Sequence, residues 1–273
     1  WKSLLPNLDE KQFAKRVFDG KWAELELKQR MSRLAEVTAK EVPSGFKAAG
    51  PLLRKMITQL ANKGLQIGGF EYMFVPEIVL NLGIDHWEES MKTIECITIY
   101  TSCEFAIRPF ILKYEERTMQ QMLQWSKHSH QNVRRLSSEG CRSRLPWSIA
   151  LPRFKKDAAL LVPILENLIA DDSLFVRKSV ANNLNDISKD LPDLALLLAQ
   201  KWQGKNDSTN WIVKHGMRTL LKSGNPASMA LFGYADVSRL ALSNFKLNQR
   251  EIDFGESVSF TFTIENKTPK KII

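Results

Sequence analysis

Apolar residues recur at three- and four-residue spacing along the chain as far as about Gly233. This spacing places apolar side chains along one face of an α-helix, so it predicts helices over most of the sequence. The dipeptide Gly50-Pro51 predicts a break between two of these helices. The pattern therefore indicates an all-α domain over residues 1–235.

Three stretches of this helical region resemble one another, around Val133-Arg134, Val176-Arg177 and Val213-Lys214. Each has an apolar residue followed at once by a basic one, and the copies lie 43 and 37 residues apart. A weaker fourth copy has Ile107-Arg108 at the same point. Each later copy follows a segment that fits the first helix of a pair: 115–127, 157–170 and 191–202. These periods predict an α-solenoid of HEAT-like helical repeats, with the second helices lining its concave side.

The pattern changes after Gly233. Apolar residues alternate with Ser and Thr from Val258 to Ile264, which predicts a half-buried β-strand. One or two strands are not stable alone in water. We therefore expect residues 236–273 to form a linker and the first strands of an incomplete β-domain, or a hairpin packed on the solenoid.

Net charge is +9, and the excess is concentrated in one part of the chain. Residues 126–223 carry 16 Lys and Arg against 9 Asp and Glu, whereas residues 1–125 carry 17 against 16 and residues 224–273 carry 6 against 5. A basic block inside a folded region is typical of a surface that binds a polyanion, because neutralising phosphates releases counterions. The alternative is a solvated basic surface without a ligand.

Composition and motifs exclude several classes. The chain is 44% hydrophobic and 25% charged, as in ordinary soluble globular proteins. Its longest apolar run, 158–165, is too short to span a membrane. Three cysteines form no CxxC pair, the four histidines have no HExxH spacing, and no phosphate-binding or dinucleotide fingerprint is present. We expect a cytoplasmic protein without metal, cofactor or membrane association.

The densest polar cluster lies at residues 134–147. On a helix, Glu139 would lie four residues after Arg135 and three before Arg142, so its carboxylate would sit between two guanidinium groups. Pro146 would end this helix and project Trp147 from a short loop. The alternative is a solvated ion-pair surface with a tryptophan in the core.

These segments resemble the HEAT-like-repeat DNA glycosylases of the AlkC type, which are bacterial DNA alkylation repair enzymes, with the AlkD type as a more distant relative. The most specific similarity is Arg-Arg-Leu-Ser-Ser-Glu-Gly-x-Arg-x-Arg-Leu-Pro-Trp at 134–147. Segments 102–110 and 172–186 support it, and the resemblance extends over most of residues 1–235. Some members carry a C-terminal immunoglobulin-like domain, which the strand at 258–264 resembles.

The resemblance implies hydrolysis of the N-glycosidic bond of cationic alkylated bases, 3-methyladenine and 3-methylcytosine, in double-stranded DNA. It implies an enzyme that acts without metal and without extruding the base. No lysine is singled out by its context as a nucleophile, so we expect a monofunctional glycosylase, acting as a monomer in the bacterial cytoplasm and nucleoid. A cationic base is already a good leaving group. The enzyme then needs an anion near the sugar, where oxocarbenium character develops, and a positioned water.

Glu104 is the first candidate for this anion, because a free carboxylate is unusual beside Cys103 and Phe105. The alternative is a first-turn residue that interacts with a helix dipole. Glu139 and Asp186 come next, as second-helix carboxylates facing the same groove. Trp147 would offer its ring to the cationic base. Arg135 would orient Glu139, and the predicted DNA contacts are Arg135, Arg142, Arg144, Arg177, Lys178 and Lys214.

Two other functions remain open. A HEAT-like array can scaffold protein partners, which predicts an apolar or mixed-charge concave face without an isolated carboxylate. A non-catalytic DNA-binding array predicts the basic groove, but with Glu104 replaceable. Five other tryptophans are expected in the core: Trp22, Trp87, Trp125, Trp202 and Trp211.

Overall fold

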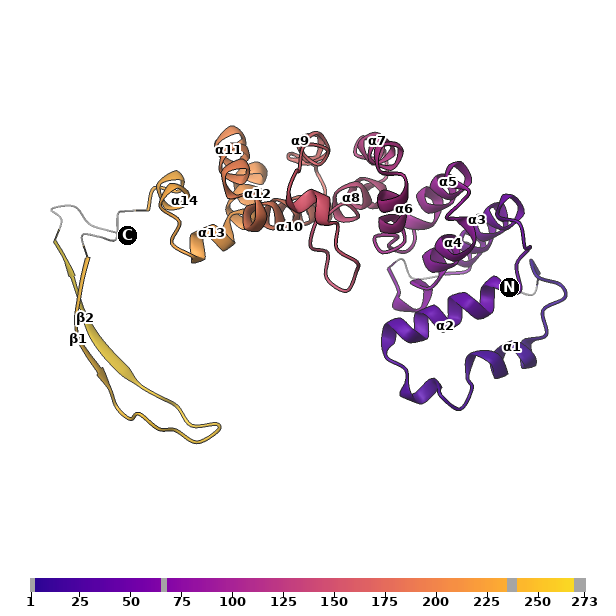
Figure 1. Cartoon of the computed structure of the whole chain (residues 1–273), viewed down its shortest axis with the longest axis horizontal. Coiled ribbons are helices and arrows are strands. Elements are labelled where there is room, and N and C mark those ends of the chain that lie inside the picture. Colours follow the sequence, from indigo (N-terminus) through magenta and orange to yellow (C-terminus); the bar gives the residue numbers. More distant parts are fainter. Residues whose placement is uncertain (1–2, 65–67, 235–239, 268–273) are drawn as a thin grey trace.

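The computed structural model describes residues 3–64, 68–234 and 240–267, and consists of a curved array of helices followed by a β-hairpin (Figure 1). The expected boundary at 235/236 lies outside the described residues. The α-helices are α1 (Glu10–Val17), α2 (Leu27–Ala39), α3 (Phe46–Asn62), α4 (Val75–Gly83), α5 (Trp87–Thr98), α6 (Ile107–Lys113), α7 (Glu115–Trp125), α8 (Gln131–Glu139), α9 (Val162–Leu168), α10 (Leu174–Asp190), α11 (Pro192–Trp202), α12 (Asp207–Gly216), α13 (Arg218–Lys222) and α14 (Pro226–Leu231). Short 3-10 helices are η1 (Trp22–Glu24), η2 (Phe70–Tyr72) and η3 (Pro152–Lys155).

The helices are arranged as the repeat pattern predicts. α5, α7, α9 and α11 follow the outer edge of the curve, and α6, α8, α10 and α12 follow its inner edge (Figure 1). The segments predicted as first helices correspond to α7, α9 and α11, and the basic copies lie on α8, α10 and α12. The predicted α-solenoid of HEAT-like repeats is therefore confirmed.

The apolar residue of each repeat copy lies in the hydrophobic core. Ile107, Val133, Val176 and Val213 are completely buried, and they belong to one cluster that extends from Leu5 to Leu220. Burying each such side chain contributes about 1.5–3 kcal/mol. Packing between successive helix pairs thus fixes which residues can reach the concave side.

The predicted break at Gly50-Pro51 is wrong, since α3 continues through both residues. A Cβ on Gly50 would lie 2.8 Å from Glu89 Oε1 and 3.0 Å from Thr93 Oγ1, both on α5. The glycine therefore allows close approach of α5. Packing of this helix outweighs the hydrogen bond that proline removes near its first turns.

The C-terminal strands form an antiparallel hairpin of β1 (Leu240–Leu247) and β2 (Phe260–Asn266), with a register irregularity between Ser243 and Lys246. The strand prediction is right, but half-burial is not: every residue of β2 is exposed. The alternative in which the hairpin packs on the solenoid is therefore not what the structure has. The immunoglobulin-like domain stays a prediction.

Within the described ranges, no helix combines the length and the apolar character that a bilayer crossing requires.

Candidate active site

Glu104 lies in the turn between α5 and α6, before the first turn of α6. Its side chain is 15% exposed, and its Oε2 accepts hydrogen bonds from Arg135 Nη1 and Ser102 Oγ, each at 2.8 Å. The expectation of a free carboxylate is therefore wrong, because Arg135 of α8 compensates its charge. The helix-dipole alternative stays open, since Glu104 lies in a turn that leads directly into α6, closed by a hydrogen bond from Ile107 N to Cys103 O at 3.1 Å.

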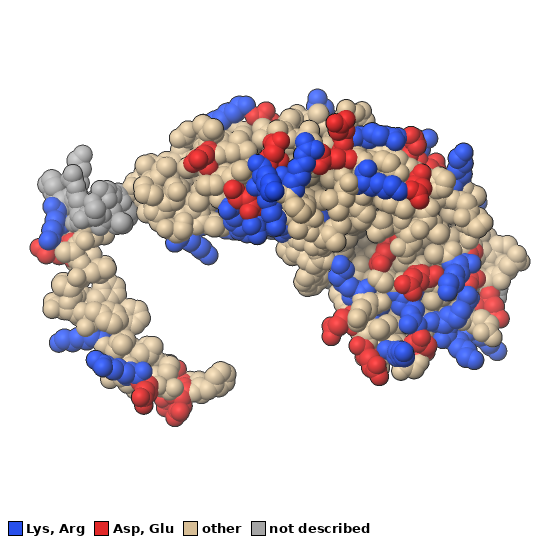
Figure 2. Space-filling view, viewed as in Figure 1, with Lys and Arg blue, Asp and Glu red and all other residues tan. Residues whose placement is uncertain are grey.

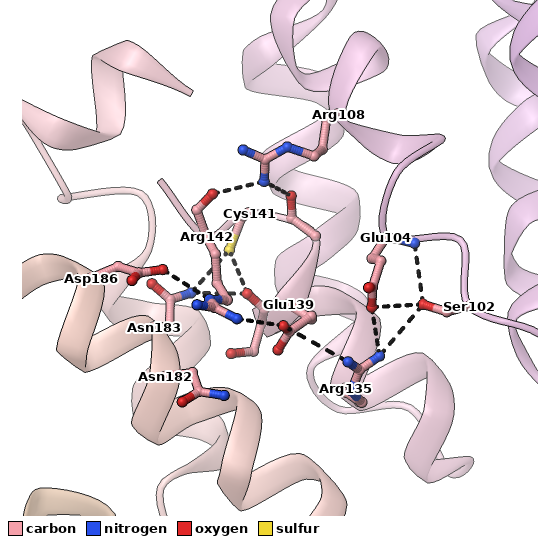
Figure 3. Close-up of polar contacts among 12 residues, drawn as sticks. Ser102, Glu104, Arg108, Arg135, Glu139, Cys141, Arg142, Asn182, Asn183 and Asp186 are labelled. Atoms are coloured by element: carbon pink, nitrogen blue, oxygen red, sulfur yellow. Dashed lines mark hydrogen bonds and ion pairs between the residues drawn. The ribbon is translucent and has the colours of Figure 1, made fainter. Parts of the chain in front are cut away.

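Beyond Arg135, oppositely charged side chains alternate from α8 to α10 (Figure 3). Arg135 Nη2 lies 3.8 Å from Glu139 Oε1, and the same oxygen accepts a hydrogen bond from Arg142 Nη1 at 2.6 Å. Arg142 Nε in turn donates to Asp186 Oδ2 on α10 at 2.9 Å. We call these five residues, Glu104, Arg135, Glu139, Arg142 and Asp186, the charge ladder. The predicted position of Glu139 between two guanidinium groups is thus observed.

Arg142 is the buried centre of the charge ladder. Its carboxylate partners are nearly inaccessible, with side chains 7% exposed for Glu139 and 2% for Asp186. Burial opposes the charge of Arg142, but Glu139 and Asp186 outweigh this cost and raise its pKa. A phosphate contact by Arg142 would have to compete with these ion pairs.

α8 ends at Glu139, so the prediction that Pro146 ends it is wrong. A Cβ on Gly140 would lie 2.6 Å from Ile107 Cγ2 of α6, so only glycine permits this approach. Arg108 then binds the carbonyl oxygens that follow, donating from Nη1 to Gly140 O at 3.0 Å and to Arg142 O at 2.7 Å. Tertiary contacts, not proline, terminate the helix.

Arg108 anchors the loop that follows α8. Its side chain is completely buried, and its Nε also donates to Ile149 O at 2.6 Å. Burial lowers its pKa to about 10, so the group remains charged at neutral pH. In the sequence, Arg108 belongs to the weak fourth repeat copy and to segment 102–110, neither of which predicted this role. The basic residues of the other repeat copies are partly or fully exposed, so the repeat pattern gives no sign that Arg108 is buried.

Trp147 projects from this loop. Its side chain is 67% exposed and its backbone has a φ of +62°, unusual for a residue other than glycine. Lys28 Nζ of α2 donates to Trp147 O at 2.5 Å and lies 5.0 Å from the centre of the Phe105 ring. The loop is therefore held from two sides, by Lys28 and Arg108. Projection of Trp147 is as expected, and the core alternative for this residue is wrong.

Glu104, Arg135 and Trp147 line one hollow of about 530 Å³. Phe175 also lines it, and its ring lies 4.4 Å below the guanidinium carbon of Arg135. In the described part of the chain, the hydrogen bonds to the Glu104 carboxylate all reach Oε2. Oε1 is therefore available to a ligand in a hollow with aromatic walls.

The other predicted cations lie outside the charge ladder. Arg144 pairs with Asp190, which lowers the pKa of that carboxyl group, and Arg177 Nη1 donates to Asp171 O at 2.7 Å and Asp172 O at 3.0 Å. Lys178 and Lys214 are exposed. Figure 2 shows a cluster of Lys and Arg where Figure 1 labels α10 and α12.

No group of three or more His, Cys, Asp or Glu residues lies close enough to hold a metal ion among the residues that the structure covers. Cys103 and Cys141 are buried, and burial raises the pKa of both thiols, that of Cys141 to about 12. Neither thiol is an accessible nucleophile.

The family model described as DNA alkylation repair enzyme matches residues 81–220. An uncharacterised protein of Bacillus subtilis, YhaZ, is 40% identical over 271 residues, which are 99% of this chain and 74% of that protein. The chain belongs to the DNA alkylation repair enzyme family. The matched residues include the whole charge ladder, and the prediction of a helical-repeat DNA alkylation repair enzyme is confirmed.

A solved structure agrees with this family. This DNA alkylation repair enzyme is 37% identical to the alkylpurine DNA glycosylase AlkC of Pseudomonas fluorescens, solved with DNA containing an abasic site analog. The TM-score is 0.79, covering 98% of this chain and 72% of that one. AlkD2 of Streptococcus mutans is 23% identical with a TM-score of 0.47, covering 71% of this chain and 98% of that one. The resemblance to the AlkC type is thus confirmed.

Proposed function

We propose that the protein is a monofunctional DNA glycosylase that hydrolyses the N-glycosidic bond of cationic alkylated bases, 3-methyladenine and 3-methylcytosine, in duplex DNA. The observation that carries this proposal is the Glu104 carboxylate, with one oxygen available, in the same hollow as the exposed ring of Trp147. The similarity to an alkylpurine DNA glycosylase solved with DNA supports the choice of substrate.

Glu104 stabilises the positive charge that develops on the sugar as the base departs. A cationic base needs no added proton to leave, so charge stabilisation and a positioned water suffice. A carboxylate about 4 Å from a unit charge contributes about 4 kcal/mol at an effective dielectric constant of about 20. Felt only in the transition state, this corresponds to about a thousandfold in rate.

Glu139 and Asp186 support the reaction indirectly. Both are nearly inaccessible and each accepts a hydrogen bond from Arg142, so neither has the room that Glu104 has to approach a sugar. Their charges hold Arg135 and Arg142 in place, and Arg135 orients the Glu104 carboxylate. Glu104 is therefore our first candidate for placing the water.

Trp147 contacts the cationic base. An aromatic ring attracts a cation by about 0.5–2 kcal/mol. The Trp147 ring is exposed on a loop that Lys28 and Arg108 anchor. A ring that projects from the surface can reach a base that stays in the duplex, so the base need not be extruded. Monomeric action in the bacterial cytoplasm stays a prediction.

Duplex DNA is the partner that the basic block between residues 126 and 223 favours. We expect the logarithm of the affinity for duplex DNA to fall linearly with the logarithm of salt concentration, with a slope that reflects several phosphate contacts. Titration of a labelled duplex between about 50 and 200 mM salt measures this slope. A flat response would favour the protein scaffold instead.

Base release by the purified chain tests the enzymatic proposal directly. We expect free 3-methyladenine and 3-methylcytosine to appear from alkylated duplex DNA, leaving abasic sites in an uncleaved strand. Chromatography of the released bases, with gel analysis before and after alkali, measures both. Binding of the duplex without base release would favour the non-catalytic array.

A further inference from the structure

A second hollow, of about 420 Å³, lies on α12 and α13. It is lined by Trp211, Lys214, His215, Arg218, Leu221 and Lys222. Trp211 was expected in the core with the other tryptophans, but its side chain is 38% exposed, whereas Trp125 and Trp202 are buried. An exposed tryptophan beside four basic residues needs a different explanation.

The Trp211 ring is stacked on a neighbour. Its centre lies 5.1 Å from that of His215, and the two ring planes differ by 7°. Burial, together with the positive charges of Arg218 and Lys178, lowers the pKa of His215, so the imidazole is neutral at neutral pH. The pair is therefore an uncharged aromatic stack, and a nucleobase can continue such a stack on the outer face of a ring.

In the described ranges, the cations around this surface, Lys214, Arg218 and Lys222, form no direct ion pair with a carboxylate, in contrast to Arg142 of the charge ladder. Arg218 instead donates to His215 O at 2.7 Å and Asn182 Oδ1 at 3.2 Å. These groups can therefore bind an anion without breaking an ion pair.

We propose that this hollow binds one unstacked nucleotide of a DNA strand, with the base stacked on Trp211 and the adjoining phosphates bound by Lys214 and Lys222. A flat aromatic surface with unpaired cations on its rim matches the two parts of a nucleotide, its base and its phosphate. A duplex backbone alone would use the cations but would leave the stacked rings without a role.

Arg218 connects this nucleotide site to the candidate active site. It lines the hollow, and it also interacts electrostatically with Asp186 and Arg142 of the charge ladder. The role of the nucleotide site in repair rests on the proposed function, since only a DNA repair reaction would give the bound strand such a role. Nucleotide binding itself does not depend on glycosylase activity.

Fluorescence anisotropy with two lesion-free probes tests the proposal: a labelled single-stranded 12-mer of thymidine, and a duplex of the same length. We expect Trp211→Ala to weaken binding of the single strand about tenfold, and Trp211→Phe to restore most of it, because stacking depends on the ring. Loss of duplex affinity should be clearly smaller. Phe18→Ala, which removes another exposed ring, is the matched control and should bind as the unaltered protein does.

Lys222→Ala should make the slope of log affinity against log salt concentration less steep for the single strand, by about 0.7, the value for one phosphate contact. Unchanged single-strand affinity of Trp211→Ala would overturn the proposal, as would an equal loss on both probes, which would indicate a duplex backbone contact. Neither probe contains a lesion. A failure here is therefore distinct from failure of the proposed function, which base release decides.

Discussion

Replacing Glu104 by Gln is expected to slow base release by about two to three orders of magnitude while DNA affinity stays nearly unchanged. The amide can still accept the hydrogen bonds from Arg135 and Ser102, but it no longer offers a negative charge to the developing oxocarbenium ion. Arg135 already offsets part of that charge, so the effect should lie at or below the thousandfold expected for an isolated carboxylate. Single-turnover release of 3-methyladenine and binding to an abasic duplex measure the two quantities.

Glu89→Gln is the matched control, because Glu89 also forms a half-buried ion pair with an arginine, Arg54, but on α5 and α3, away from the hollow. It should release bases at the unaltered rate. If Glu104→Gln retained full activity, the carboxylate assignment would be rejected and Glu139 and Asp186 would have to be reconsidered. Equal losses in both variants would instead indicate a general effect on the fold.

The repeat architecture was predictable because it depends on short-range periodicity. Apolar positions such as Val133, Val176 and Val213 recur at a fixed point in each helix pair, and helix packing requires them to be buried. The same regularity placed Glu139 between Arg135 and Arg142, since side chains three and four residues apart remain neighbours even where the helix ends between them.

The ends of helices were less predictable, because they depend on contacts between distant residues. Gly50 and Gly140 both lie where another helix approaches too closely for a Cβ, yet one is inside a helix and the other just after one. What distinguishes Gly140 is Arg108, which binds the carbonyl oxygens that follow it. Residues 32 and 34 positions apart in sequence have no local pattern that would reveal this contact.

The partners of the site residues were hidden for the same reason. The sequence favoured Glu104 as an isolated carboxylate, but its partner Arg135 is 31 residues away. The exposure of Trp211 was likewise invisible, since its helical spacing is equally suitable for the core. In the structure, Trp211 lies on the helix face that also carries Lys214 and His215, and all three line the same hollow.

Replacing Arg142 by Ala is expected to lower stability by about 3–5 kcal/mol, the largest effect that we predict on folding. The change leaves Asp186 and Glu139 buried without the guanidinium that both contact most closely, at 2.9 and 2.6 Å. Removing one partner of a buried ion pair costs more than the pair itself contributes, because the remaining charge stays desolvated. At about 2–4 °C per kcal/mol, the midpoint of thermal unfolding should fall by roughly 10 °C, which calorimetry or circular dichroism measures.

Arg144→Ala is the control for this variant, since Arg144 also pairs with an aspartate of α10 but is itself 42% exposed. Exposed pairs contribute at most about 1 kcal/mol, so its midpoint should change little. Arg144 lowers the pKa of Asp190. The pair therefore contributes to stability above the ordinary pKa of an aspartate, and this contribution is lost as pH falls through the lowered pKa of Asp190. The small difference in stability between Arg144→Ala and the unaltered protein should accordingly vanish in acid. Equal destabilisation by the two substitutions at neutral pH would show that burial of the charge ladder does not distinguish Arg142 from a surface arginine.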